Sequence, residues 1–120
     1  MRILIVDDDR LILKSLSHLL EEEGYTVFTA ADGMKALDFI EKEDLDLIIS
    51  DIMMPNLSGI SLITLLEKNL ASKVPVILIS ALDQSPAILN ALGLSSNDCF
   101  VKPINYQELV KRVKSFEKKK

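Results

Sequence analysis

Residues 3–9, ILIVDDD, place four apolar side chains directly before three carboxylates, Asp7, Asp8 and Asp9. The apolar run is typical of a short buried strand, so the carboxylates stand where that strand ends. Two carboxylates about 5 Å apart, at an effective dielectric near 20, repel each other by about 3 kcal/mol. That repulsion has to be offset by water, by a helix N-terminus or by a cation.

The rest of the chain alternates short apolar runs with segments of helical period. The runs predicted as strands are residues 3–6, 26–30, 45–50, 74–80 and 99–101. The segments predicted as helices are residues 11–23, 34–42, 59–69, 86–92 and 105–116. Five strand–helix units in strict alternation predict a doubly wound α/β fold, in which a parallel sheet carries helices on both faces.

Length and composition limit the classes of function. A chain of 120 residues suits one domain, which we expect to cover residues 1–120. The net charge of −4 gives no general attraction for DNA or anionic lipid, so we expect no direct nucleic-acid or membrane partner. One cysteine, no signal-peptide layout and no apolar run long enough for a bilayer favour a cytoplasmic protein.

Polar residues stand at the carboxyl ends of the predicted strands. Asp7 to Asp9 follow the first strand, Asp51 follows the third, Ser80 ends the fourth and Lys102 follows the fifth. In a parallel sheet these ends share one edge, which is where α/β proteins bind ligands. The sequence therefore predicts a site made of carboxylates, a hydroxyl and a lysine.

Oxygen ligands in this number suit a hard cation such as Mg²⁺. We expect Asp8 and Asp51 to bind it directly, and Asp7 to bind directly or through water. Asp9 is expected to point instead toward the first turn of the following helix, where an anion is favourable. A bound cation would then offset the repulsion within the acidic run.

A carboxylate also acts as a nucleophile toward phosphorus, and Asp51 is the best candidate because it ends the middle strand. Mg²⁺ and Lys102 would neutralise the phosphoryl oxygens, and the Ser80 hydroxyl would donate a hydrogen bond. Each residue alone has an ordinary structural explanation, such as a turn former or a surface lysine. Their conjunction at one sheet edge favours phosphoryl chemistry.

The stretches ILIVDDD, DLIISDIMMPNLSG, VPVILISA and FVKP resemble the receiver domain of bacterial response regulators, including chemotaxis regulators. The resemblance implies a five-stranded flavodoxin-like sheet in the order 2-1-3-4-5. It implies that Asp51 accepts a phosphoryl group from a sensor histidine kinase or a phosphotransfer protein, in a Mg²⁺-dependent reaction. It also implies a cis peptide bond between Lys102 and Pro103.

The same resemblance assigns the other residues of the site. Asp7 and Asp8 serve the metal, and the backbone carbonyl of Met53 completes its coordination shell. The hydroxyl of Ser80 and the ammonium of Lys102 bind the phosphoryl group. The protein is then a switch whose only intrinsic chemistry is Mg²⁺-dependent autophosphorylation and autodephosphorylation, and not an enzyme in the ordinary sense.

The sequence departs from the family where receiver domains usually carry a switching aromatic residue, because Cys99 stands there. Phe100 is adjacent, but strand alternation directs it to the opposite face. We therefore expect signalling to depend on Ser80 and the loop after it. Met53 and Leu82 occupy the two positions that tune phosphoryl lifetime in the family, and neither orients a hydrolytic water, so we expect slow autodephosphorylation.

Residues 84–97 contain no charged side chain. In the family the fourth helix, fifth strand and last helix form the output surface. An uncharged stretch there favours an interface. The interface would be with a downstream partner, with an output domain missing from this chain, or with a second copy, as a homodimer, through the face from Pro86 to Leu92. Simple packing of the helix on the sheet explains the composition equally well. The chain is either a single-domain regulator or a receiver cut from a longer protein.

Rival functions are weaker. An aspartyl phosphatase of the haloacid-dehalogenase type needs a second aspartate where Met53 stands. A flavin module needs a phosphate-binding first loop, which Asp7 to Asp9 would repel, and a nicotinamide site needs G-x-G-x-x-G, which is absent. The remaining alternative is a phosphorylation-independent docking module, against which the complete acidic set argues.

Overall fold

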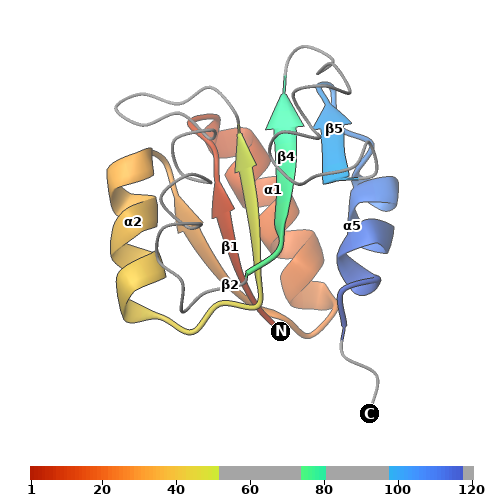
Figure 1. Ribbon diagram of the computed structural model, residues 1–120. Coiled ribbons are helices and arrows are strands. Elements are labelled where there is room, and N and C mark those ends of the chain that lie inside the picture. Colours follow the sequence, from red (N-terminus) through yellow and green to blue (C-terminus); the bar gives the residue numbers. More distant parts are fainter. Residues whose placement is uncertain (52–73, 81–97, 118–120) are drawn as a thin grey trace.

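The computed structural model describes residues 1–51, 74–80 and 98–117. They form one five-stranded parallel sheet in the order β2-β1-β3-β4-β5, which confirms the predicted doubly wound order (Figure 1). The strands are β1 (Arg2–Val6), β2 (Thr26–Ala30), β3 (Leu47–Asp51), β4 (Val76–Ser80) and β5 (Cys99–Val101). The helices are α1 (Arg10–Glu22), α2 (Gly33–Lys42) and α5 (Tyr106–Lys114).

The element boundaries differ from the predicted ones by a few residues. β3 begins at Leu47 and not at residue 45, and β4 begins at Val76 and not at residue 74. Pro75, directly before β4, has no backbone N–H to donate to a ladder, so it belongs outside the regular strand. The helices predicted over residues 59–69 and 86–92 lie outside the described residues.

Each described helix begins with a side-chain cap close behind a strand. The Asp9 carboxylate accepts hydrogen bonds from the backbone N–H groups of Leu11 at 2.9 Å and Ile12 at 3.4 Å, as expected for a residue pointing into the first turn. Asp32 caps α2 and Asn105 caps α5 in the same manner. These caps satisfy N–H groups that the helices leave without intrahelical partners, and they fix where each helix starts.

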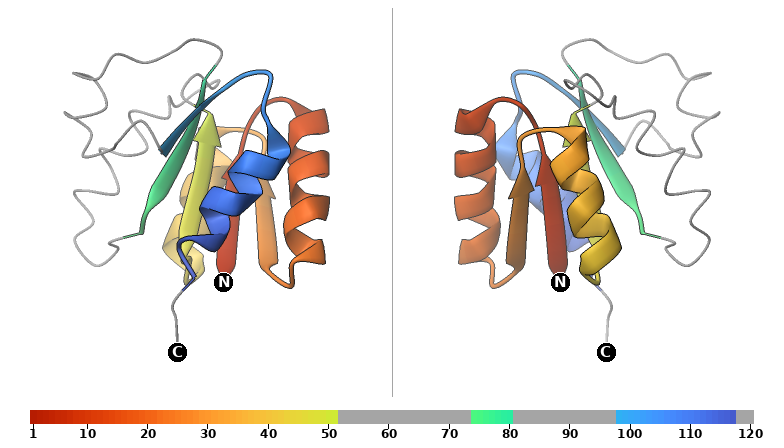
Figure 2. Two further views of the ribbon diagram at one scale, coloured as in Figure 1. Left: turned by 90° about the vertical axis from the view of Figure 1, so that its right-hand side faces the viewer. Right: turned by 90° about the vertical axis from the view of Figure 1, so that its left-hand side faces the viewer.

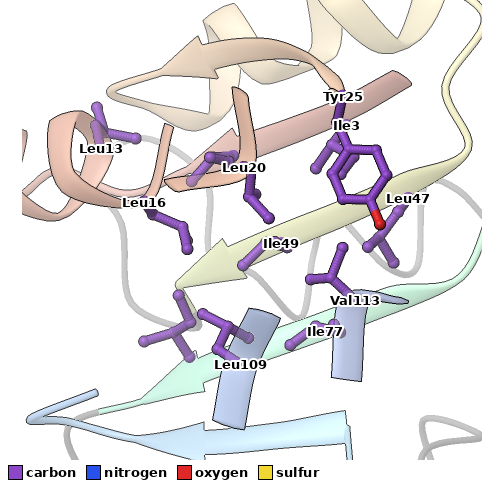
Figure 3. Packing of buried hydrophobic residues seen from close by; sticks show 12 residues of the cluster. Ile3, Leu13, Leu16, Leu20, Tyr25, Leu47, Ile49, Ile77, Leu109 and Val113 are labelled. Atoms are coloured by element: carbon purple, nitrogen blue, oxygen red, sulfur yellow. The ribbon is translucent and has the colours of Figure 1, made fainter. Parts of the chain in front are cut away.

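The central strands β1, β3 and β4 are buried on both faces, which is why they are nearly continuous apolar runs. Helices α1 and α5 cover one face, and α2 packs on the other (Figure 2). Figure 3 shows the core on the face that α1 and α5 cover, where leucines of α1 pack with Leu109 and Val113 of α5 over isoleucines of the sheet. Among the described helices, none has the length and apolar character needed to cross a bilayer.

The last turn of α5 is held to the connection between α1 and β2. Tyr25 is 8% exposed, and its hydroxyl donates to the carboxylate of Glu117. Nearby, Lys114 Nζ lies 2.9 Å from a carboxylate oxygen of Glu23. Gly24 makes this turn with φ of +92°, a conformation that favours glycine. The start of β1 and the end of α5 therefore lie near the amino edge of the sheet, away from the acidic run (Figure 1).

This clamp predicts a specific loss of stability in alkali. Burial and the hydrogen bond to Glu117 raise the pKa of Tyr25 above its usual value. Its contribution to stability is therefore complete below pH 10, where an unfolded tyrosine ionises, and is lost as the pH rises further. We expect Tyr25→Phe to lose about 1 kcal/mol of unfolding free energy at pH 7, from the missing hydrogen bond, and to decline less steeply above pH 10.

Urea unfolding at pH 7 and at several values above pH 9.5 measures both effects. Tyr106→Phe is the matched control, because it removes a phenol from α5 that has no part in the clamp, and it should keep the wild-type decline. An equal decline in Tyr25→Phe and wild type would show that Tyr25 ionises normally in the folded protein.

Candidate functional site

Three carboxylates converge at the carboxyl edge of the sheet. Asp7 and Asp8 follow β1, and Asp51 is the last residue of β3, the strand that pairs with β1 with Val6 opposite Ser50. One carboxylate oxygen from each lies within 4.8 Å of the others. Asp7 is 0% and Asp51 6% exposed, whereas Asp8 faces solvent. The cluster thus has a buried floor and an open side.

Lys102 joins the cluster from the far end of the chain. Its Nζ lies 3.1 Å from Asp51 Oδ2 and 3.3 Å from Asp7 Oδ2. The backbone supports this placement, because the Lys102 N–H donates to the Ser80 carbonyl at 2.7 Å. The Lys102–Pro103 peptide bond is cis, as the resemblance implied. Residues separated by 51 and 95 positions in sequence therefore share one small volume.

Ser80 is the last residue of β4, is 4% exposed and lies opposite Val101 of β5. It therefore stands at the same edge as Asp51, one strand away. The carbonyl of Met53, the side chain of Leu82 and the face from Pro86 to Leu92 lie outside the described residues, so their assigned roles stay predictions.

Among the described residues, the negative charge of the site exceeds its positive charge. Burial, together with the negative charge of Asp51, raises the pKa of Asp7, although the Asp9 N–H at 2.8 Å and Lys102 act in the opposite direction. Burial lowers the pKa of Lys102, but its hydrogen bond to Asp51 and the charge of Asp7 outweigh burial, so the net shift is upward. One ammonium thus faces three carboxylates, a net charge of about −2 when all are ionised.

The donor set fits a divalent hard cation. All three side chains offer oxygen, which Mg²⁺ prefers, and the exposed side leaves room for the waters it retains. Asp7 Oδ2 is buried and has no well-aligned hydrogen bond among the described residues; its contact with Lys102 is one of charge. A cation at this place would supply the missing partner and the missing charge.

Comparison with known proteins agrees with this geometry. Residues 3–114 match the family described as "Response regulator receiver domain". The chain belongs to this family. Receiver domains bind Mg²⁺ at an acidic pocket, and those of transcriptional regulators are not classical enzymes.

Three similar proteins illustrate the relationship. The chain is 40% identical over 114 residues to a "Transcriptional regulatory protein CpxR homolog" of Haemophilus influenzae, covering 95% of this chain and 49% of that protein. The receiver domain of the Francisella response regulator 1452 superimposes with a TM-score of 0.85 at 37% identity, covering 96% of this chain and 94% of that one. The response regulator TrrA from Thermotoga maritima, solved in complex with Mg(2+)-BeF, gives a TM-score of 0.83 at 34% identity and covers 97% of this chain and 98% of that one.

The chain spans about half the length of the curated relatives it matches. The functions of the other half of those relatives are therefore not attributed to this receiver domain.

The structure also resolves the neighbouring residues on β5. Cys99 packs against the cluster on the α2 face, and Phe100 packs against the cluster beneath α1 and α5. The prediction that Phe100 lies on the opposite face from Cys99 is confirmed.

The sequence did not predict one contact of the site, the hydrogen bond that the Asp9 backbone N–H donates to the Asp7 carboxylate. Only the consecutive run of aspartates hinted at it.

The imbalance of charge predicts that the site costs stability. Because burial raises its pKa, Asp7 favours the folded state at acid pH and loses that contribution as the pH rises through the raised value. We expect Asp7→Asn, which keeps the shape and removes the charge, to raise the melting temperature of the metal-free protein at pH 7 by several degrees, on the order of 1 kcal/mol in a domain of this size. The gain should shrink toward pH 4.

Calorimetric melting in EDTA and in MgCl₂ checks this expectation. Mg²⁺ should stabilise the wild type and leave Asp7→Asn nearly unchanged. Asp44→Asn removes the same charge at the opposite edge and is the control. A lower melting temperature for Asp7→Asn in EDTA would mean that Lys102 fully compensates the buried carboxylate.

Proposed function

We propose that this chain is the phosphoacceptor switch of a two-component phosphorelay, with residues 1–120 acting as one receiver domain in the cytoplasm. The supporting observation is the convergence of Asp7, Asp8 and Asp51 with Lys102 at one edge of the sheet. The phosphodonor would be a sensor histidine kinase or a phosphotransfer protein. Membership of the response regulator receiver family supports this assignment.

In the proposed reaction a carboxylate oxygen of Asp51 attacks the phosphorus of a phosphohistidine. The new O–P bond forms as the P–N bond breaks, and the electron pair of that bond stays on the imidazole nitrogen. Lys102, already 3.1 Å from Asp51 Oδ2, follows the charge onto the phosphoryl oxygens. Ser80, at the same edge, donates its hydroxyl to another of these oxygens.

The residues that would hold Mg²⁺ are Asp7, Asp8, Asp51 and the backbone carbonyl of Met53. When bound, the ion would neutralise the charge that develops on the phosphoryl oxygens. The protein residues do the rest of the work: Asp9 fixes Asp7 through its N–H, and Lys102 orients the Asp51 carboxylate through a hydrogen bond to Oδ2.

The competing function is a docking module that no longer takes up phosphate. Such a module would gain stability by losing Asp7, since a buried and poorly compensated carboxylate serves no purpose in docking. The retention of Asp7 together with Asp8, Asp51 and Lys102 therefore favours the phosphoacceptor.

The output would pass through the fourth helix, β5 and α5 to a downstream effector or an output domain. A groove of about 630 Å³ runs along β5 and α5, between Cys99, Val101, Lys111 and Arg112. Val101 in this groove is 39% exposed. A homodimer through the face from Pro86 to Leu92 is the alternative use of this output surface. Cys99 stands where receiver domains usually carry a switching aromatic residue. We therefore propose that Ser80 and the loop after it undergo the conformational change on phosphorylation. We also propose that the downstream partner is neither nucleic acid nor membrane.

Phosphorylation of Asp51 is directly measurable. Incubation with phosphoramidate and MgCl₂, followed by intact mass, should show one phosphoryl group on the wild type and none on Asp51→Asn, because the amide is not a nucleophile for this step. EDTA should abolish uptake. Asp38→Asn, a change of the same type on α2, is the control and should be phosphorylated normally. Uptake by Asp51→Asn equal to wild type would refute the assignment of the acceptor.

The lifetime of the phosphoryl group is predicted to be long. Met53 and Leu82 are apolar, so neither residue orients a water for attack on the acyl phosphate. After rapid removal of the donor, we expect the phosphorylated mass to persist for minutes or longer. Met53→Asn, which introduces a water-binding amide, should shorten the lifetime several-fold. Decay of the wild type within seconds would contradict the role given to these two positions.

A further inference from the structure

Ser50 is a polar residue in an apolar layer. It precedes Asp51 in β3 and lies between Val6 of β1 and Leu78 of β4, both of which belong to the core cluster on the α2 face. Its exposure is 0%. Burying a hydroxyl in such a layer is unfavourable unless it is hydrogen-bonded, so an aliphatic residue would be the simpler choice for packing.

The hydroxyl of Ser50 has a definite partner. Its Oγ donates to the backbone carbonyl of Asp51 at 3.0 Å, and the contact is buried. This carbonyl belongs to the peptide that follows the last residue of β3, where the chain leaves the sheet. The bond therefore fixes the orientation of that peptide and with it the ψ angle of Asp51.

The ψ angle and the side-chain rotamer of a residue depend on each other, because the rotamers allowed at Cβ are limited by the local backbone. The position of the Asp51 carboxylate is constrained by its neighbours. Its Oδ2 lies 3.1 Å from Lys102 Nζ, and one of its oxygens lies within 4.8 Å of a carboxylate oxygen of Asp7 and of Asp8. Groups that react are commonly held to about 0.5 Å, and a displacement near 1 Å costs up to about a hundredfold in rate.

We propose that Ser50 is a positioning residue for Asp51: by holding the Asp51 carbonyl, its hydroxyl keeps the carboxylate aimed at Lys102 and at the acidic pair. The inference rests on the proposed phosphoacceptor function. It assigns to Ser50 a role in the rate of phosphorylation and in metal affinity, and not a role in folding. A purely structural hydroxyl would instead change stability and leave both of those quantities alone.

The test compares wild type with Ser50→Ala, Ser50→Thr and Ser17→Ala. Ser50→Ala removes the hydroxyl, Ser50→Thr keeps it on a side chain that strands tolerate well, and Ser17→Ala removes an exposed hydroxyl from α1 as the control. Three quantities are measured: the rate of phosphorylation by phosphoramidate in MgCl₂, the Mg²⁺ dissociation constant by titration calorimetry without phosphodonor, and the melting temperature in EDTA.

We expect Ser50→Ala to be phosphorylated about five- to tenfold more slowly and to bind Mg²⁺ several-fold more weakly, with a melting temperature close to wild type. Ser50→Thr should recover most of both losses, and Ser17→Ala should match wild type in all three. Wild-type rate and Mg²⁺ affinity in Ser50→Ala would overturn the proposal. So would a loss that Ser50→Thr does not recover, since that result would trace the effect to packing.

The Mg²⁺ titration separates this proposal from the proposed function. If wild type took up no phosphoryl group, the phosphoacceptor function would fail, yet weaker Mg²⁺ binding by Ser50→Ala, restored in Ser50→Thr, would still support the positioning of Asp51 by Ser50. If wild type were phosphorylated and Ser50→Ala were indistinguishable from it in rate and affinity, the function would stand and the role of Ser50 would not.

Discussion

The contact of the Lys102 ammonium with Asp7 and Asp51 is the interaction on which the site depends. It is available only because β1, β3 and β5 end at the same edge of a parallel sheet. The carboxylates repel one another, and a single lysine does not balance three of them. The apolar layers on both faces of the sheet supply the stability that keeps this edge folded despite its charge.

The charged side chains at the two edges of the sheet differ in their burial and in their partners. At the amino edge, Arg2 pairs with Glu43 at 2.5 Å, its Nε donates to the Asp44 carbonyl at 2.8 Å, and its backbone N–H donates to Asp46 at 2.8 Å. There the acidic side chains are exposed or half-buried, so water screens the charges that Arg2 does not pair with, and the Arg2 contacts stabilise the chain connections. At the carboxyl edge, two of the three clustered carboxylates are buried and the described residues supply one ammonium, an imbalance typical of a site that binds a ligand.

Much of this arrangement follows from sequence pattern. Nearly continuous apolar runs at residues 3–6, 45–50 and 74–80 predicted buried parallel strands, and the polar residues at the ends of these runs predicted the edge at which the site forms. Alternation alone placed Cys99 and Phe100 on opposite faces. The pattern erred by one or two residues at strand starts, because backbone hydrogen bonds decide those positions and hydropathy does not.

Ser50 shows what the pattern does not contain. By periodicity it is one more buried position of β3, and nothing in its neighbours distinguishes a packing residue from one that holds a carbonyl. Its role depends on where its hydroxyl points, which is a property of the backbone at the end of the strand. Similarly, the N–H of Asp9 that reaches Asp7 follows from the turn between β1 and α1 and not from the acidic run as such.

On the proposed phosphoacceptor function, Lys102 couples the binding of metal to the phosphorylation of Asp51. In the described structure Lys102 divides its charge between Asp7 and Asp51. A phosphoryl group on Asp51 would draw the ammonium toward its oxygens, and the buried Oδ2 of Asp7 would then lose its nearest described cation. The phosphorylated state therefore needs the metal more than the free state does, and by linkage the metal favours phosphorylation to the same extent. A shift from 1:99 to 99:1 requires about 5.5 kcal/mol, which is several charge-assisted hydrogen bonds of the kind Lys102 and Ser80 would provide. On the proposed function, the bonds that Lys102 and Ser80 form with the phosphoryl group would therefore supply much of the energy that such a switch requires.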